Sequence, residues 1–326
     1  KILFKRLNIK IIIMKNIIQA DPNKIPRYVG ISTFARLPYY ESLDKVDIGV
    51  IGIPFDSGCT FRSGARFGPE AIRKSSRLLR AYNPDQDKYP FLDNQVADMG
   101  DIPCTPFDNK QAVDQIYLGV SSFLSNLKNA IFLGGDHTIS YPILKAINEK
   151  YKPKDGITLI HFDSHMDTWD EYFDEKITHG TPFKRAFEEN LINKNTSIHV
   201  GIRGSINSKD DFKNDEELGF KIIPCSDIVN PKIGIDGIVD KIKKRVGDSL
   251  CYISIDIDVV DPAFAPGTGT PECGGFSSLE MLTILKKLKV LNIIGGDIVE
   301  VAPCYDSSDI TSTLAATICY ELICLI

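Results

Sequence analysis

Short apolar runs, rich in β-branched residues, alternate with longer amphipathic stretches along the chain from about residue 45 onward. Continuous apolar runs without polar alternation are typical of strands buried on both faces, as in parallel sheets. The pattern predicts strands over residues 46–53, 130–133, 157–162, 197–202, 221–223, 251–257 and 292–299. It predicts helices over residues 69–79, 110–127, 141–150, 181–189, 235–246, 278–288 and 311–323.

This alternation of strands and helices is typical of a single α/β domain with a parallel sheet. No Pro-, Ser- or Gly-rich linker divides the 326 residues. We therefore expect one domain, preceded by an N-terminal arm. The first twenty residues carry five Lys or Arg and no acid. We expect this arm to be disordered or partly non-native, with residues 1–13 preceding the natural start; organelle targeting by residues 1–20 is the alternative.

Composition and charge narrow the class of protein. Hydrophobic residues make up 43% and charged residues 25% of the chain, which is normal for a globular protein with a sizeable core. With 38 Lys and Arg against 43 Asp and Glu, the net charge of −5 argues against a nucleic-acid partner. No run approaches the roughly 18 apolar residues of a membrane span. The eight cysteines include no Cys-x-x-Cys pair, so we expect reduced thiols in a cytoplasmic protein.

Polar side chains follow three of the predicted strands at the point where each strand ends. In open α/β sheets, ligands bind beyond the carboxyl ends of the strands. The three segments are Gly134-Gly135-Asp136-His137, Asp163-Ser164-His165-Met166-Asp167 and Asp256-Ile257-Asp258. Alternate side chains of an extended chain share one face, so we expect Asp163, His165 and Asp167 to point the same way, and Asp256 and Asp258 to do likewise.

Six side chains of these segments, four carboxylates and two imidazoles, are the candidate ligands: His137, Asp163, His165, Asp167, Asp256 and Asp258. Grouping so many acids is unfavourable unless cations neutralise them, and six ligands suit a pair of divalent ions. Oxygen ligands with some imidazole favour Mn²⁺, with Fe, Ni, Co and Zn as alternatives, and the lack of a thiolate argues against structural zinc. Any one segment alone is more often a turn or a solvated face. His161 and His199 lie inside apolar runs, which favours positions in the core or behind the ligands.

Three long motifs surround these residues: GGDHTIS at 134–140, HFDSHMD at 161–167 and SIDIDVVDPAFAPGTGTPECGG at 254–275. They resemble the motifs of the ureohydrolases, the family of arginase and agmatinase. Further similar stretches are FRSGARFGPEAIR at 61–73, HGTPF at 179–183 and DIVEVAPCYD at 297–306. The resemblance runs from about residue 27 to the C-terminus and implies a catalytic domain over residues 27–326 after an N-terminal arm over residues 1–26. It implies a three-layer α/β/α domain around an eight-stranded, mostly parallel sheet, a binuclear manganese site, and a homotrimer or homohexamer.

The resemblance also implies roles for individual residues. One Mn²⁺ would be held by His137, Asp163, Asp167 and Asp256, and the other by Asp163, His165, Asp256 and Asp258. His179 matches the proton-shuttle histidine of the family, and Glu300 matches the acid that binds the substrate guanidinium. The implied reaction hydrolyses the guanidino group of a small guanidine compound to urea and a primary amine, with Asp167 passing a proton to the leaving amine.

The loop between Asp167 and His179 is the expected specificity element, because it lacks the Asn and Ser pattern that reads an α-carboxylate in arginase-type relatives. It carries four acids and one base: Asp170, Glu171, Asp174, Glu175 and Lys176. An acidic rim attracts a dicationic substrate and repels a carboxylate tail, which favours agmatine over 4-guanidinobutyrate. An ordinary solvated face is the alternative. The candidate substrate contacts here are Trp169, Asp170 and Glu171.

Other features keep alternatives open. Residues 175–192 resemble guanidinobutyrase-type relatives at least as closely, and Arg203 or Arg62 could bind a substrate carboxylate. A single-zinc deacylase on a related fold and a metal-binding paralogue without activity are remoter alternatives. The complete set of six ligands opposes the deacylase, and the presence of His179 and Glu300 opposes the inactive paralogue.

Overall fold

Eight strands form one sheet in the computed structural model, which describes residues 18–39 and 45–326. Their order is β2-β1-β3-β8-β7-β4-β5-β6, and every neighbouring pair runs parallel. The sheet is thus parallel throughout rather than mostly parallel. The strands are β1 (Ile48–Ile53), β2 (Val96–Asp101), β3 (Asn129–Gly134), β4 (Thr158–Phe162), β5 (Ile198–Ile202), β6 (Lys221–Pro224), β7 (Leu250–Asp256) and β8 (Asn292–Val299).

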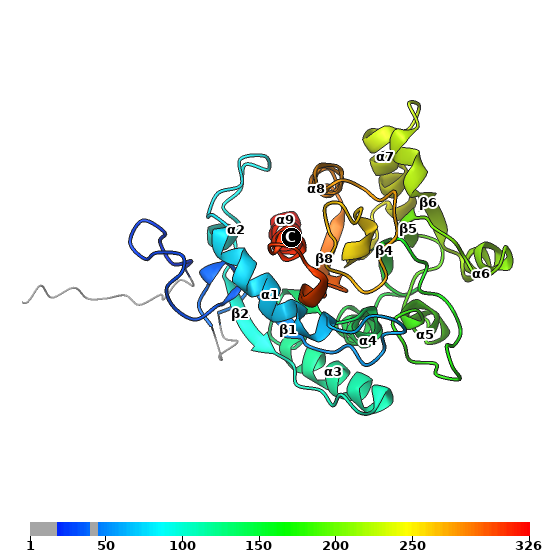
Figure 1. Cartoon of the computed structure of the whole chain (residues 1–326), viewed down its shortest axis with the longest axis horizontal. Helices are drawn as coiled ribbons and strands as arrows, with labels where there is room; N and C mark the ends of the chain where they lie inside the picture. Colours follow the sequence, from blue (N-terminus) through cyan, green and yellow to red (C-terminus); the bar gives the residue numbers. More distant parts are fainter. Residues whose placement is uncertain (1–17, 40–44) are drawn as a thin grey trace, which may run out of the picture.

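Helices cover both faces of the sheet and complete three layers (Figure 1). One face carries α1 (Gly68–Ser75), α7 (Gly234–Val246), α8 (Ser278–Lys286) and α9 (Ile310–Leu325). The other carries α3 (Asn109–Leu124), α4 (Ser140–Tyr151) and α5 (Pro182–Glu188). Alternate residues of β3 enter two separate apolar cores, Ile131 with the residues of α9 and Phe132 with those of α3 and α4. This burial on both faces confirms the α/β architecture that the unbroken apolar runs predict.

The apolar pattern predicts neither β2 nor α6 (Asp210–Leu218), nor the single turn of α2 (Pro90–Asp93). β2 is an edge strand with Asp98 in its middle. α6 has five acids among its nine residues, and only Asp215 and Leu218 are buried. Both elements are too polar for a hydrophobic period to be visible, because buried polar contacts replace part of the apolar face.

A buried ion pair holds α1 against the edge of the sheet. The Asp98 carboxylate is 1% exposed and accepts hydrogen bonds from Arg73 Nε at 2.9 Å and Arg73 Nη2 at 3.1 Å. It also accepts from the backbone N–H of Phe34 at 2.6 Å, which ties the N-terminal segment to the same point. These contacts explain how an acid occupies the interior of β2.

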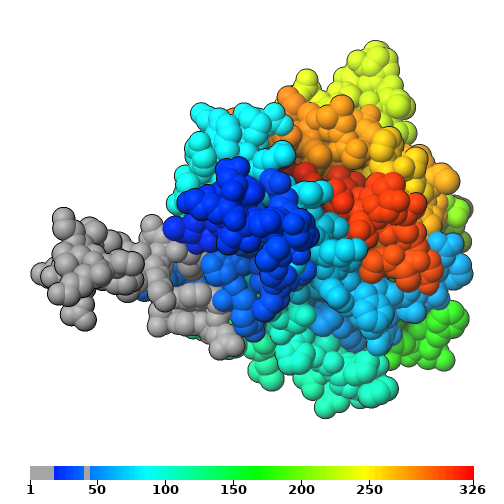
Figure 2. Space-filling model, turned by 60° about the vertical axis from the view of Figure 1, so that its left-hand side comes forward, coloured from blue at the N-terminus to red at the C-terminus, as the bar shows by residue number. Residues whose placement is uncertain are grey.

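The N-terminal segment packs on the surface beside this edge, where Figure 2 shows residues 18–39 in blue. Gln19 donates from Nε2 to the carbonyl oxygens of Ala35 and Leu79, at 2.8 and 3.1 Å. Arg36 donates to the carbonyl of Ala20 at 2.8 Å. Residues 18–26 of the expected arm therefore make defined contacts, whereas residues 1–17, and with them the expectations about a natural start and targeting, lie outside the described residues.

Two further expectations concern cysteines and membranes. All eight cysteines lie in the described residues and carry free thiols. Among the helices of residues 18–39 and 45–326, none combines the length and the apolarity that crossing a bilayer needs.

Replacing Arg73 tests the buried ion pair. The substitution Arg73→Met leaves the Asp98 carboxylate buried without its partner, so we expect the free energy of unfolding to fall by about 3–5 kcal/mol. Lys74→Met is the matched control on the same helix, because Lys74 pairs with Asp309 in solvent, with side chains 66% and 52% exposed; it should cost less than about 1 kcal/mol. Denaturant unfolding of the two variants measures both values, and equal costs would contradict the role given to Arg73.

Candidate metal centre

The predicted ligands meet at the carboxyl edge of the four middle strands. β3, β8, β7 and β4 are neighbours in that order, and each ends in a segment of the site. His137 follows β3, Asp163 and Asp167 follow β4, Asp256 ends β7, and Glu300 follows β8. The structure thus brings the predicted residues together beyond these strand ends.

The backbone of these segments is not extended, which corrects the expected geometry. Asp258 lies in a 3₁₀ turn (Ile257–Val259), and Asp167 has a φ of 56° in the left-handed region. The turns arise because carboxylates accept backbone N–H groups two residues ahead: His165 N–H donates to Asp163 Oδ1 at 2.6 Å, and Asp258 N–H donates to Asp256 Oδ1 at 2.8 Å. Tight turns, rather than strand alternation, bring the ligands together.

His137 is held in one tautomer. Ser254 Oγ donates to the Asp297 carboxylate at 2.6 Å, so it accepts from His137 Nε2 at 2.9 Å. This hydrogen-bond network assigns a proton to Nε2 and leaves Nδ1 to face the site. His137 is fully buried, and its Nδ1 has no hydrogen-bond partner.

Three carboxylates surround that Nδ1 atom. It lies 2.8 Å from Asp167 Oδ2, 3.1 Å from Asp163 Oδ2 and 3.5 Å from Asp256 Oδ2. A lone pair facing three carboxylate oxygens in a buried space is repulsive, so the cluster needs a cation or an added proton. Its donor atoms suit a divalent ion that accepts oxygen and imidazole ligands.

A second cluster shares Asp163 with the first. His165 Nδ1 lies 3.3 Å from Asp163 Oδ1 and 3.2 Å from Asp258 Oδ2. Ser164 donates its N–H and its hydroxyl to Asp258 Oδ1, at 3.1 and 2.7 Å, and Asp258 Oδ2 is left without a partner. Asp163 therefore turns one oxygen to each cluster, which is the arrangement that a pair of cations needs from a bridging ligand.

Burial and mutual repulsion change the pKa values in this centre. Burial, with the charges of Asp258 and Asp163, raises the pKa of Asp256 well above its usual range, and burial beside Asp163 raises the pKa of Asp167 to about 6. Burial alone lowers the pKa of His137, but the three neighbouring carboxylates reverse this and raise it well above its ordinary value. Without a cation the centre therefore holds extra protons.

His179 and Glu300 lie together beside the first cluster. His179 Nε2 accepts the N–H of Thr60 at 3.1 Å, so in its neutral form the ring donates from Nδ1 to Glu300 Oε1 at 3.0 Å. Burial lowers the pKa of His179, and the Glu300 carboxylate more than reverses this, raising it to about 9. Glu300 Oε1 also accepts the N–H of His137 at 2.9 Å.

The second oxygen of Glu300 is free. Oε2 is buried and has no hydrogen-bond partner among the described residues. Glu300 also has a φ of 62°, a left-handed conformation that costs a non-glycine residue of the order of 1 kcal/mol. A strained acid with an unpartnered buried oxygen is suited to receive a cationic group.

The cavity above the clusters has a volume of about 120 Å³. Its lining comprises Thr60, His165, Asp167, Trp169, Tyr172, His179, Gly180, Asp256 and Thr270. Trp169 and Tyr172 meet edge to face, with ring centroids 5.9 Å apart, and form an aromatic wall. The lining includes no Lys or Arg.

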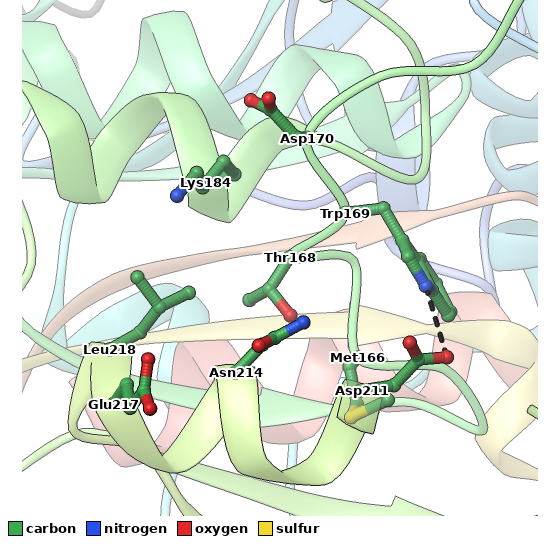
Figure 3. Close-up of a pocket in the computed structure, with 9 residues that line it drawn as sticks. All are labelled: Met166, Thr168, Trp169, Asp170, Lys184, Asp211, Asn214, Glu217 and Leu218. Atoms are coloured by element: carbon green, nitrogen blue, oxygen red, sulfur yellow. Dashed lines mark hydrogen bonds between the residues drawn. The ribbon is translucent and has the colours of Figure 1, made fainter. Parts of the chain in front are cut away.

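The acids of the specificity loop do not enter this cavity. Asp170 Oδ1 accepts from Arg185 Nη2 at 2.5 Å and borders a neighbouring pocket, where Figure 3 shows it near Lys184. Glu171 is exposed and is absent from the lining. Of the three candidate substrate contacts, only Trp169 reaches the site, so the acidic-rim argument for agmatine loses its structural basis.

The two arginines considered for binding a substrate carboxylate differ in whether their guanidinium groups are already hydrogen-bonded. Arg203 donates to several backbone carbonyls, including those of Asp258 at 2.6 Å and Glu272 at 2.7 Å. These bonds occupy its guanidinium in holding the ligand loops, so it is not free for substrate. Arg62 lies 5.3 Å from the ring centroid of Phe61 and 5.2 Å from that of Tyr305.

Several residues of the site have no clear signal in the sequence. Thr60 binds His179, and the fully buried Asp136 accepts Gly58 N–H at 2.8 Å. Ser254 and Asp297 orient His137. Thr60 stands directly before one family-like motif, and Asp136, Ser254 and Asp297 stand inside others. The motifs therefore indicate which segments form the site, but not which side chains contact one another.

Comparisons with known proteins agree with this geometry. The site defines a metal-dependent hydrolase on a three-layer α/β/α fold, and the Arginase family profile matches residues 46–324. The chain is 38% identical to the guanidinobutyrase of Pseudomonas aeruginosa, over 93% of this chain and 95% of that one. It is 40% identical to an agmatinase of Chromobacterium violaceum, over 91% and 89%.

A solved structure supports the same assignment. Proclavaminate amidino hydrolase from Streptomyces clavuligerus superposes with a TM-score of 0.87 at 38% identity, covering 92% of this chain and 98% of that one. The chain therefore belongs to the arginase family. It is an agmatinase-like ureohydrolase, a hydrolase of linear amidines. The arginase family has a binuclear metal site, and the two His/Asp clusters are candidate ligand groups for it.

Metal binding should depend on pH. The raised pKa values of His137 and His165 mean that both rings keep a proton in the metal-free protein at pH values where free histidine loses it. A metal needs the nitrogen lone pair, so binding must release protons and the affinity must weaken as pH falls. Calorimetric titration of Mn²⁺ in buffers of different ionisation enthalpy measures this release. A binding enthalpy that is identical in all buffers, with a pH-independent affinity, would contradict it.

Proposed function

We propose that this ureohydrolase uses two Mn²⁺ ions to cleave agmatine to putrescine and urea. One observation carries the metal part: Asp163 divides its two oxygens between an imidazole–carboxylate cluster at His137 and another at His165. Beside them, Glu300 Oε2 is buried and unpartnered. We further propose a homotrimer or homohexamer, which rests on the family resemblance, and a cytoplasmic location, which rests on the eight free thiols.

The donor set fits two divalent ions. His137, Asp163, Asp167 and Asp256 would hold one, and Asp163, His165, Asp256 and Asp258 the other. Carboxylate and imidazole ligands favour Mn²⁺, with Fe, Ni, Co and Zn as alternatives. When bound, such a pair lowers the pKa of a water molecule toward neutrality and so supplies the nucleophile.

The side chains of this chain position the substrate. The carbon of a guanidinium is resonance-stabilised and a poor electrophile, so orientation has a large effect on the rate. Glu300 Oε2 would pair with the guanidinium, while Oε1 stays fixed by the His137 N–H and by His179. Trp169 and Tyr172 would flank the substrate and exclude water from that side.

Protons leave and enter through two groups on the cavity wall. The Asp167 carboxylate lines the cavity and would carry a proton from the water nucleophile to the departing amine. His179 side-chain atoms are 12% exposed and also touch the Thr60 hydroxyl, at 2.7 Å from Nε2. It is therefore placed to exchange protons between the cavity and solvent.

The substrate assignment rests on the charge of the cavity. No Lys or Arg lines the cavity, so the carboxylate tail of a guanidino acid would find no cationic partner there. Agmatine carries an ammonium group at that end instead, which does not require a cationic partner. The second candidate is 4-guanidinobutyrate. It is favoured by Arg62, which follows the aromatic Phe61 and has no acidic partner among the described residues, and by the similarity to a guanidinobutyrase.

A substrate panel separates these candidates. With Mn²⁺ supplied, urea release is measured from agmatine, 4-guanidinobutyrate, 3-guanidinopropionate, arginine and free guanidine. We expect the highest kcat/KM for agmatine, and no change for agmatine in the Arg62→Gln variant. A preference for 4-guanidinobutyrate that falls about 10-fold or more in Arg62→Gln would instead establish the guanidino acid, since a lost charged hydrogen bond costs about 1.5–3 kcal/mol.

Glu300→Gln tests substrate binding by the acid. Gln keeps an oxygen at Oε1 for His137 N–H and His179, but replaces Oε2 with an NH₂ group that donates and so repels a guanidinium. We expect kcat/KM to fall about 100-fold, the size expected for one charged hydrogen bond, with the Mn²⁺ content unchanged. Glu149→Gln, which alters an exposed acid bonded to Tyr117, is the control. Full activity of Glu300→Gln would remove Glu300 from the mechanism.

A further inference from the structure

A row of buried polar side chains runs from the metal centre to α6. Its members are Asp163, His161 of β4, His199 of β5 and Asp215 of α6, and none of them is exposed to solvent. His161 Nε2 lies 2.8 Å from Asp163 Oδ2, and the Nδ1 atoms of the two histidines lie 2.7 Å apart. His199 Nε2 lies 3.2 Å from Asp215 Oδ1, and neither this nitrogen nor Asp215 Oδ2 has a hydrogen-bond partner among the described residues.

Hydrogen-bond chemistry gives this row a direction. The Asp163 carboxylate only accepts, so His161 donates to it from Nε2. The Nδ1 of His161 then accepts from the Nδ1 of His199. The Nε2 of His199 and the Asp215 carboxylate face each other at 3.2 Å, and a hydrogen bond between them requires one further proton, which makes the pair an imidazolium and a carboxylate. The row therefore fixes the ring of His161, and through it the orientation of the carboxylate that both clusters share.

Asp215 also contacts the other end of the ligand segment. Its Oδ1 accepts the hydroxyl of Thr168 at 2.9 Å, and Thr168 directly follows Asp167, the ligand with a φ of 56°. Figure 3 shows Thr168 facing α6, next to Asn214. A single acid on α6 thus reaches Asp163 through two imidazoles and Asp167 through one hydroxyl.

Packing alone does not explain such a row. Its surroundings are apolar: Phe183 lies 4.4 Å from the ring of His161, and Phe220 stacks on His199 at 4.0 Å. Polar groups in such a place cost free energy unless each is paired, and apolar side chains would fill the same space without that cost. The presence of these polar groups is explained if their hydrogen bonds hold the ligands of the adjacent metal centre in place.

We propose that His161, His199 and Asp215 are positioning residues that hold Asp163 across the two metal clusters and fix the turn that carries Asp167. The inference depends on the proposed function only in that divalent ions occupy the clusters. Asp163 Oδ2 receives the His161 bond while it faces His137 Nδ1 at 3.1 Å, so loss of the row frees the carboxylate to rotate. Outer contacts of this kind change metal affinity by about 10–100-fold.

The first test replaces His199 by Phe in the full chain. Phe keeps an aromatic ring against Phe220 but has no nitrogen atoms to continue the row. We expect the Mn²⁺ dissociation constant to rise about 10-fold or more, and the electron paramagnetic resonance spectrum of the Mn²⁺-loaded protein to change. Thr158→Val is the matched control, because it removes a buried hydroxyl contact of β4, with Thr196, that does not connect to the row.

Two substitutions of Asp215 separate its charge from its contacts, both of which use Oδ1. Asp215→Asn keeps an oxygen for the Thr168 hydroxyl and removes the charge that faces His199. Asp215→Leu removes both contacts. We expect the Mn²⁺ dissociation constant to increase from the wild-type protein to Asp215→Asn and again to Asp215→Leu. The Asn variant is nearly isosteric, so it yields a folded protein for the comparison if His199→Phe does not fold.

The readouts distinguish positioning from simple packing. If His199→Phe and Asp215→Asn lower only the melting temperature of the metal-free protein, as Thr158→Val should, while Mn²⁺ affinity and the resonance spectrum stay unchanged, the proposal is overturned. A wild-type protein that binds Mn²⁺ but releases no urea would defeat the proposed function and leave this metal-binding comparison valid.

Discussion

Buried negative charge is the constraint on which the rest of this structure depends. The four acids of the centre are at most 6% exposed, and His137 is not exposed at all. An isolated buried carboxylate costs several kcal/mol, and here three of them converge within 3.5 Å of one imidazole nitrogen. Positive charge must enter the site, either as protons or as divalent cations. The raised pKa values result from this crowding, and so does the placement of the two Asp163 oxygens, one in each cluster.

The parallel sheet makes this crowding possible. Its four middle strands end side by side, and the loops that follow them are held by close backbone contacts rather than by side-chain packing alone. At Gly135 an added Cβ would lie 2.1 Å from the carbonyl oxygen of Phe55, so only glycine allows the β3 loop to approach and place His137. On the opposite side, Arg203 joins the carbonyls of Asp258 and Glu272. These contacts position the loops that carry the acids.

The sequence predicted most of the sheet and all six proposed ligands, because both leave a local pattern: apolar runs for the buried strands, and acids or histidines directly after them. It did not predict β2 or α6, whose buried faces are partly polar, and the role of Asp215 was therefore not visible. The side-chain direction at Asp170 was also beyond reach, since its pairing with Arg185 depends on how α5 packs. Long-range polar contacts have no sequence period, so only the folded structure reveals them.

The most direct test of the account is the number and position of metal ions in a crystal of the Mn²⁺-loaded protein, located by anomalous scattering at the manganese edge. Neutralisation by a pair of cations predicts two anomalous peaks per chain, one bound to His137 and one bound to His165, with Asp163 contacting both. A single peak, or a filled centre in which His137 Nδ1 still faces the three carboxylates without a metal, would contradict it.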